Sequence, residues 1–126
     1  MKSMNPHIVF AGDTQEALGF YQSVFGGELE VVLIGDRDHD GLPPEAVFHA
    51  DLRGEKFRLM GADGRVAERG GFSMHVLCDD KAELERYFHA LEDRGSVHCS
   101  VCEAFGGWYG QVTDRFGIQW FLTCAA

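Results

Sequence analysis

Residues 13–27 read DTQEALGFYQSVFGG, and residues 80–95 read DKAELERYFHALEDRG. Each stretch begins with an aspartate that has a glutamate three positions later, which is the pattern of a capping box. Apolar side chains then recur at helical spacing, and glycine follows, as is typical of a left-handed helix end. Both stretches therefore predict amphipathic helices. The capping pairs are Asp13 with Glu16 and Asp80 with Glu83, and the terminal glycines are Gly26, Gly27 and Gly95.

A shift of 67 residues superposes the two helices, and the segments around them repeat as well. Each helix follows a short apolar run and precedes three segments that are rich in Val, Phe, Leu and Ile and bounded by Gly, Asp or Pro. The expected strands are 7–12, 28–35, 46–54 and 56–63 around the first helix and 72–78, 96–102, 108–114 and 118–124 around the second. The chain therefore predicts a β-α-β-β-β module written twice, which is an α+β fold.

Length and composition limit the classes of protein. With 126 residues we expect one domain, residues 1–126, with modules of approximately 1–66 and 67–126. The net charge of −9 and the scattered basic residues argue against a nucleic-acid binder and against binding to anionic membranes. No secretion signal or apolar run of about 18 residues is visible. We expect a cytoplasmic protein whose four cysteines are reduced.

The segment HCSVC, residues 98–102, contains a Cys-x-x-Cys pair beside a histidine. Zinc binding or redox chemistry would require both sulfurs to converge. In a regular strand, however, alternate side chains point to opposite faces, so Cys99 and Cys102 should lie apart. We therefore interpret them as buried or half-buried structural thiols.

Residues 16–29 (EALGFYQSVFGGEL) and 109–122 (YGQVTDRFGIQWFL) together resemble the vicinal oxygen chelate superfamily of glyoxalases, bleomycin-resistance proteins and dioxygenases. The closer resemblance is to the PhnB-like branch, and GFSMHVLCDD, residues 71–80, matches the opening of its second half. The resemblance implies two tandem βαβββ modules whose curled mixed sheets surround a cavity, and it implies a homodimer. It does not imply one reaction, because one fold hosts many chemistries.

The metal-dependent members of this superfamily hold a divalent ion with histidine, glutamine and glutamate side chains from four strands. Here the implied positions fall on Pro6, Ser73, Phe121 and either Leu59 or Met60. None of these side chains is a good ligand for a divalent ion, so we expect no metal and no cofactor. His7 and His75 lie one and two residues from such positions, which leaves an altered histidine-based site as an alternative.

Without a metal, the candidate binding residues are those that line the expected cavity. They are Ser73, His75, Phe105, Trp108, Tyr109, Gln119 and Phe121, with Thr123 beside them. Binding pockets are mostly apolar with a few polar groups that orient the ligand. The leading hypothesis is a metal-free protein that binds a small, partly apolar molecule, with or without catalysis. The alternatives are a metal-dependent glyoxalase- or dioxygenase-type enzyme and a dimeric structural or regulatory protein.

Overall fold

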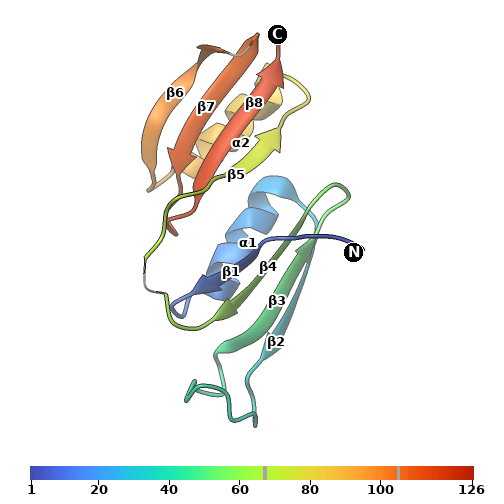
Figure 1. Ribbon diagram of the computed structural model, residues 1–126, viewed down its shortest axis with the longest axis vertical. Coiled ribbons are helices and arrows are strands. Elements are labelled where there is room, and N and C mark those ends of the chain that lie inside the picture. The colour runs from blue at the N-terminus through green and yellow to red at the C-terminus, as the bar shows by residue number, and fades with distance from the viewer. Residues whose placement is uncertain (67, 105) are drawn as a thin grey trace. The chain divides into compact units, whose positions relative to one another are not determined.

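The computed structural model describes residues 1–66, 68–104 and 106–126 (Figure 1). The chain divides into two compact units, Met1–Ala67 and Glu68–Ala126. Each unit contains one helix and one four-stranded sheet. That the two units make up a single domain stays a prediction.

The first unit has the predicted order of elements. They are β1 (His7–Phe10), α1 (Thr14–Phe25), β2 (Glu28–Leu33), β3 (Val47–Arg53) and β4 (Arg58–Asp63). The strand order in the sheet is β1-β4-β3-β2, in which β1 runs parallel to β4 and the other neighbours are antiparallel. The first and last strands of the unit are therefore neighbours in the sheet.

The second unit repeats this arrangement. Its elements are β5 (Met74–Leu77), α2 (Lys81–Glu92), β6 (Ser96–Ala104), β7 (Gly107–Thr113) and β8 (Gln119–Ala125). The strand order is β5-β8-β7-β6, again with one parallel pair, β5 and β8. The predicted α+β fold of two βαβββ modules is confirmed, and the two mixed sheets are open, not closed barrels.

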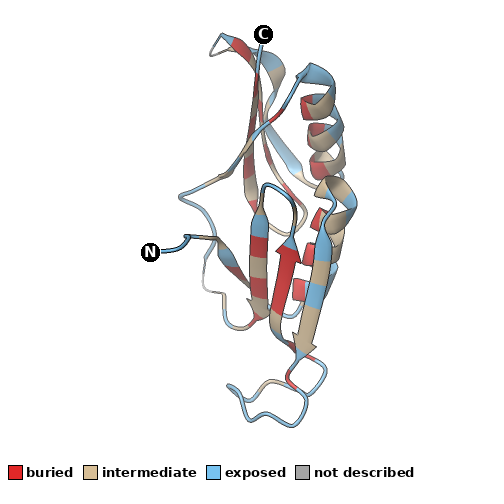
Figure 2. Cartoon of the chain, turned by 90° about the vertical axis from the view of Figure 1, so that its right-hand side faces the viewer, coloured by how far each residue is buried: buried red, intermediate tan, exposed pale blue. Residues whose placement is uncertain are grey.

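Each unit has its own hydrophobic core between its helix and one face of its sheet (Figure 2). In the first unit, Leu18 and Tyr21 of α1 are fully buried, as is Leu52 of β3. In the second unit, Leu84 and Leu91 of α2 are fully buried, and Val112, Trp120 and Leu122 supply the sheet side. The helical spacing and the strand alternation read from the sequence thus identify the surfaces that pack together.

The two helix starts differ in a way that the sequence did not predict. Asp80 caps α2, because its carboxylate accepts a hydrogen bond from the Glu83 amide at 2.8 Å. Asp13 precedes α1 but makes no side-chain cap. Asp63, at the end of β4, instead accepts the Thr14 amide at 3.1 Å. The expected capping box at Asp13 is therefore wrong, and a carboxylate distant in sequence takes its place.

The predicted helix ends are confirmed at α1 and corrected at α2. Gly26 and Gly27 both have positive φ, 80° and 100°, as expected. After α2, however, the residue with positive φ is Arg94, at 59°. A Cβ on Gly95 would lie 2.3 Å from the Thr113 carbonyl oxygen. Gly95 therefore permits close approach of two backbones, and its predicted left-handed conformation is wrong.

A buried aspartate organises the turn between β7 and β8. Asp114 accepts hydrogen bonds from the Phe116 and Ile118 amides and, at 2.8 Å, from the Trp120 indole nitrogen. Gly117 has a φ of 84°, which suits a glycine in a tight turn. The turn predicted from DRFG, residues 114–117, is confirmed.

The helices also bear on the question of membranes. Both have 12 residues. Within the described part of the chain, neither is long and apolar enough to span a bilayer.

Candidate functional site

Alternation along β7 and β8 gives the second sheet two different faces. Trp120 and Leu122 are buried on the side of α2, whereas Phe121 and Thr123 point to the opposite side and are only half-buried. We call this opposite side the polar–aromatic face. Its side chains include His75, His98, Tyr109, Gln111, Thr113, Gln119, Phe121 and Thr123.

A continuous series of contacts crosses the polar–aromatic face. The His75 ring lies 5.1 Å from the Phe121 ring, centroid to centroid, and the Tyr109 ring lies 5.3 Å from Phe121 on the other side. His75 Nε2 is 2.8 Å from Thr123 Oγ1. The Tyr109 hydroxyl donates to Gln111 Oε1 at 3.1 Å. Three strands, β5, β8 and β7, thus bring an imidazole, two aromatic rings, a hydroxyl and an amide together.

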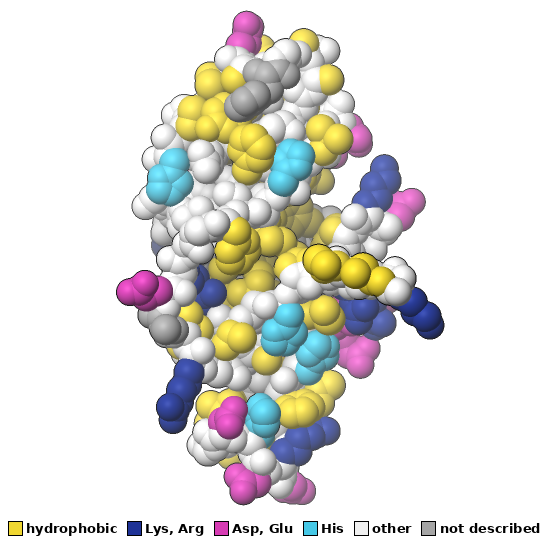
Figure 3. Space-filling view, viewed as in Figure 1, with side chains coloured by type: hydrophobic (Ala, Val, Ile, Leu, Met, Phe, Trp, Pro, Cys, Tyr) yellow, Lys and Arg dark blue, Asp and Glu magenta, His cyan; other side chains and the backbone are white. Residues whose placement is uncertain are grey.

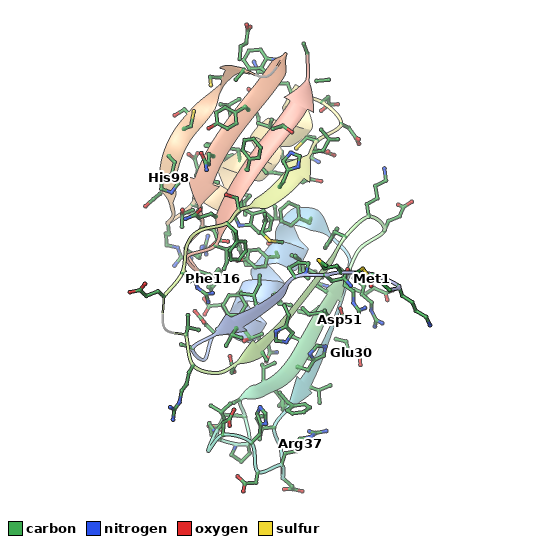
Figure 4. All side chains as sticks on the ribbon, viewed as in Figure 1. Met1, Glu30, Arg37, Asp51, His98 and Phe116 are labelled. Atoms are coloured by element: carbon green, nitrogen blue, oxygen red, sulfur yellow. The ribbon has the colours of Figure 1, made fainter. Side chains whose placement is uncertain are left out.

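A second imidazole lies on β6. His98 Nε2 is 2.6 Å from Thr113 Oγ1 of β7, and Figure 4 labels its position on the second unit. Figure 3 shows hydrophobic side chains and imidazoles gathered on the same side of this unit. Each histidine can donate or accept a hydrogen bond, according to its tautomer. Such a surface can cover an apolar ring and orient a polar group at the same time.

The cysteine pair on β6 differs from the prediction. Cys99 Sγ and Cys102 Sγ are 3.9 Å apart, although a regular strand would place such residues on opposite faces. The register of β6 against β7 shifts twice, between Val97 and Cys99 and between Cys99 and Cys102. These irregularities bring the two sulfurs together. Cys102 is also exposed, so describing both thiols as buried or half-buried is wrong for this residue.

The candidate binding residues do not all share one place. His75, Tyr109 and Phe121 are in contact, as described above. Gln119 has the same alternation as Phe121 and lies on the same face. Ser73 lies just before β5 and is half-buried. Phe105 lies outside the described residues.

Trp108 is separated from these residues. It precedes Tyr109 on β7, so its side chain points toward α2, where the Lys81 ammonium lies 3.8 Å from the indole centroid. Trp108 therefore does not contribute to the polar–aromatic face. It also does not lie beside Phe121, as it would if the two residues filled the sheet cavity together.

Sequence reasoning missed three members of the face: His98, Gln111 and Thr113. Alternate residues of a strand share a face, so the position of Tyr109 predicts that Gln111 and Thr113 lie on the same face. His98 gave no such signal, because in a regular strand it would share a face with Ser100 and Cys102 and not with Cys99. Its contact with Thr113 depends on the irregular register of β6.

The residues do not fit the divalent metal that the superfamily's ligand pattern implies. His7 stacks on His49 with centroids 5.9 Å apart, and each has a ring that could ligate. Within residues 1–66, 68–104 and 106–126, however, no three histidine, cysteine, aspartate or glutamate side chains form a group that could hold a metal ion. Phe121 occupies the position on β8 where the superfamily's pattern would place a metal ligand, and its ring packs on His75.

Asp51 lies two residues after His49 on β3, but its carboxylate is already bound by an arginine. Asp51 accepts two hydrogen bonds from the Arg58 guanidinium, at 3.0 and 2.8 Å. These bonds lower the pKa of Asp51 and outweigh the opposite effect of burial. Arg53 adds an ion pair with Glu30 at 3.0 Å (Figure 4 labels Asp51 and Glu30). This part of the first sheet is therefore an ion-pair network.

The described residues also border hollows in both units. In the first unit, a hollow of about 310 Å³ lies between the end of β1, the loop before β3 and Asp63. In the second unit, a smaller hollow of about 80 Å³ is bordered by Arg69, Phe72 and Gln119. Of the candidate residues, Gln119 is the one that borders the smaller hollow.

The fold and these features define a class of protein. Two open βαβββ units with parallel first and last strands are the arrangement of the vicinal oxygen chelate superfamily, as the sequence resemblance implied. A glyoxalase/bleomycin resistance protein/dioxygenase from Nocardioides shares this fold, with a TM-score of 0.62, 14% identity, and 99% of this chain and 84% of that chain covered.

The family follows from closer matches. Over residues 2–123 the chain matches the family model described as 3-demethylubiquinone-9 3-methyltransferase, and it belongs to this family. Protein PA1353 from Pseudomonas aeruginosa has 32% identity and a TM-score of 0.90, covering 99% of this chain and 98% of that chain. A PhnB protein from Bacillus cereus has 28% identity and a TM-score of 0.79, covering 98% and 100%. Protein YjdN of Escherichia coli is 26% identical over 94% of this chain and 92% of its own.

Proposed function

We propose that the polar–aromatic face of the second unit binds a small, partly apolar molecule. The observation that carries this proposal is the unbroken contact series from Thr123 through His75 and Phe121 to Tyr109 and Gln111. The aromatic rings offer apolar surface, and the imidazole, hydroxyl and amide offer hydrogen bonds within reach of the same molecule.

The reaction of a protein depends on the residues of its site, because one fold hosts many chemistries. The imidazoles of His75 and His98 are the groups on this face that general acid–base chemistry would use. We therefore propose binding as the function and leave catalysis as a property to be measured on the same face.

A titration with p-cresol tests the proposal. The ring of p-cresol suits Phe121 and Tyr109, and its hydroxyl suits His75. We expect amide chemical-shift changes concentrated on β5, β7 and β8, with Phe121→Ala weakening binding about two- to thirteenfold, because an aromatic pair contributes roughly 0.5–1.5 kcal/mol. Shift changes that cluster around the hollow beside Asp63, or no changes at all, would contradict the proposal.

Phe48→Ala is the matched control for this titration. Phe48 is an exposed aromatic residue on β3 of the first unit, whereas the contact series lies on β5, β7 and β8 of the second unit. We expect this variant to bind p-cresol as the unchanged protein does. Equal weakening by both substitutions would mean that the loss reflects general aromatic surface rather than this face.

We further propose that two copies of the chain associate, and that the protein works in the cytoplasm. Large apolar side chains are exposed on both units, among them Leu33, Phe48, Leu77 and Val97. Contacts with a second copy would remove such surface from water. Light scattering coupled to gel filtration tests the dimer, and a monomer at all concentrations would contradict it.

A further inference from the structure

Cys99 and Cys102 lie unusually close for residues three apart on a strand. A strand rises about 3.3 Å per residue, so a regular strand would separate their Cα atoms by about 10 Å on opposite faces. Their sulfurs are 3.9 Å apart because β6 loses its regular register on either side of Cys99. The irregularity of the strand therefore creates the pair.

The distance is short enough for a covalent bond. A disulfide requires about 2.05 Å between sulfurs, so the two atoms would have to approach by about 1.9 Å. In the reduced protein the two thiols share a hydrogen bond. Cys99 also donates to the Ser100 carbonyl oxygen at 3.5 Å.

The four cysteines differ in access to reagents. Cys102 is exposed and Cys99 is half-buried, whereas Cys78 and Cys124 are buried. Burial raises the pKa of the Cys78 thiol to about 12, so this group is thiol rather than thiolate at neutral pH. The chain thus contains an accessible pair and, in the same unit, two inert cysteines for comparison.

We propose that Cys99 and Cys102 form a dithiol site that low-molecular-weight disulfides, such as oxidised glutathione, convert to an internal disulfide. The argument for this site rests on the sulfur geometry and does not depend on the ligand proposed above. Cys102 is the first nucleophile because it is the exposed member of the pair. Cys99 is the resolving thiol.

The reaction has two exchange steps. The Cys102 thiolate attacks one sulfur of the reagent, the reagent's S–S bond breaks, and one reagent thiolate leaves. Cys99, after losing its proton to solvent, then attacks Cys102 Sγ, and the second reagent thiolate leaves. The protein loses two electrons and two protons, and the reagent takes them up as two thiols.

The environment of the pair sets the pH dependence of this reaction. Desolvation and the hydrogen bond with Cys99 raise the pKa of Cys102 above its ordinary value of 9.0. Between pH 7 and pH 8 only a small fraction is thiolate, so we expect the exchange rate to rise about tenfold over this unit of pH.

The site also touches the polar–aromatic face. Burial and a hydrogen bond with Cys99 raise the pKa of the Tyr109 hydroxyl. Closing the disulfide removes the Cys99 thiol proton and moves its sulfur. The Tyr109 ring resonances therefore report on oxidation independently of mass or thiol counts.

The experiment uses the full chain, reduced, freed of reductant and incubated with oxidised glutathione at pH 8. We expect the intact mass to fall by two hydrogens, with peptide mapping to a bond between Cys99 and Cys102. We expect Cys99→Ser to accumulate glutathione on Cys102, because the resolving thiol is missing. Cys78→Ser and Cys124→Ser should oxidise as the unchanged protein does.

Three results would overturn the proposal. They are stable glutathione adducts on the unchanged protein without an internal bond, equal reaction of all four cysteines, and no reaction under conditions that oxidise dithiothreitol. Amide spectra of each serine variant, compared with the unchanged protein, show whether the fold is kept. If a variant loses its fold, alkylation of the unchanged protein provides the test instead. The alkylating reagent must then label Cys102 before Cys78 and Cys124.

Discussion

A single buried carboxylate, Asp63, connects helix α1 to the sheet of the first unit. It accepts hydrogen bonds from the amide and hydroxyl of Thr14, at 3.1 and 2.7 Å, and from the Val47 amide at 2.8 Å. We expect Asp63→Ala to lower the free energy of unfolding by about 2–4 kcal/mol, because buried donors then lose their acceptor. Asp63→Asn should cost less, since its amide oxygen can still accept. Urea denaturation measures both, with the exposed loop residue Asp36→Asn as control.

The same carboxylate makes stability depend on acid. Burial would raise the pKa of Asp63, but the hydrogen bonds from Val47 and Thr14 prevail and lower it. The folded protein therefore binds this proton less readily than the unfolded chain. The contribution of Asp63 is complete above about pH 4 and is lost as the pH falls through the lowered pKa. Below pH 4, Asp63→Asn should lose less stability than the unchanged protein, and equal acid sensitivity would contradict this assignment.

At the scale of elements, Gly95 and Gly19 should respond oppositely to the same substitution. A Cβ at Gly95, between α2 and β6, would overlap the Thr113 carbonyl oxygen, whereas a Cβ at Gly19 in α1 meets open space. We expect Gly95→Ala to destabilise by about 1–3 kcal/mol through overpacking. Gly19→Ala should stabilise by about 0.5–1 kcal/mol through helix propensity. Thermal unfolding of both variants shows whether each substitution raises or lowers stability. If Gly95→Ala raised it, the close approach of Gly95 to the Thr113 carbonyl oxygen would be contradicted.

The elements show how far the sequence alone could lead. Helical and strand periods identified the two helices and eight strands of the described residues, because each period marks a surface that must be buried. The same alternation also places Trp108 toward α2, because it precedes Tyr109 on β7. The convergence of Cys99 and Cys102 could not be read in this way, because it depends on how β6 pairs with β7. The cap at Thr14 likewise depends on Asp63, which is 49 residues away in sequence.

At the scale of the whole molecule, net charge opposes the association of two copies. The chain carries 20 acidic and 11 basic residues, a net charge of −9 at pH 7. A dimer brings two such charges together, while the burial of apolar surface favours it. Raising the salt concentration from about 0.01 M to about 0.15 M shortens the screening length from about 30 Å to about 8 Å. We therefore expect the dimer dissociation constant to fall severalfold over this range.

Sedimentation velocity at several protein concentrations measures that constant. Lowering the pH from 7 toward 5, near the sequence isoelectric point of about 5.0, should strengthen association in the same direction, because it removes net charge. Added salt and lower pH both weaken the repulsion between the negative charges of the two copies, and neither changes how much apolar surface is buried. A dissociation constant that rises with salt would instead indicate ion pairs across the interface, and the exposed apolar side chains would then not be what holds the copies together.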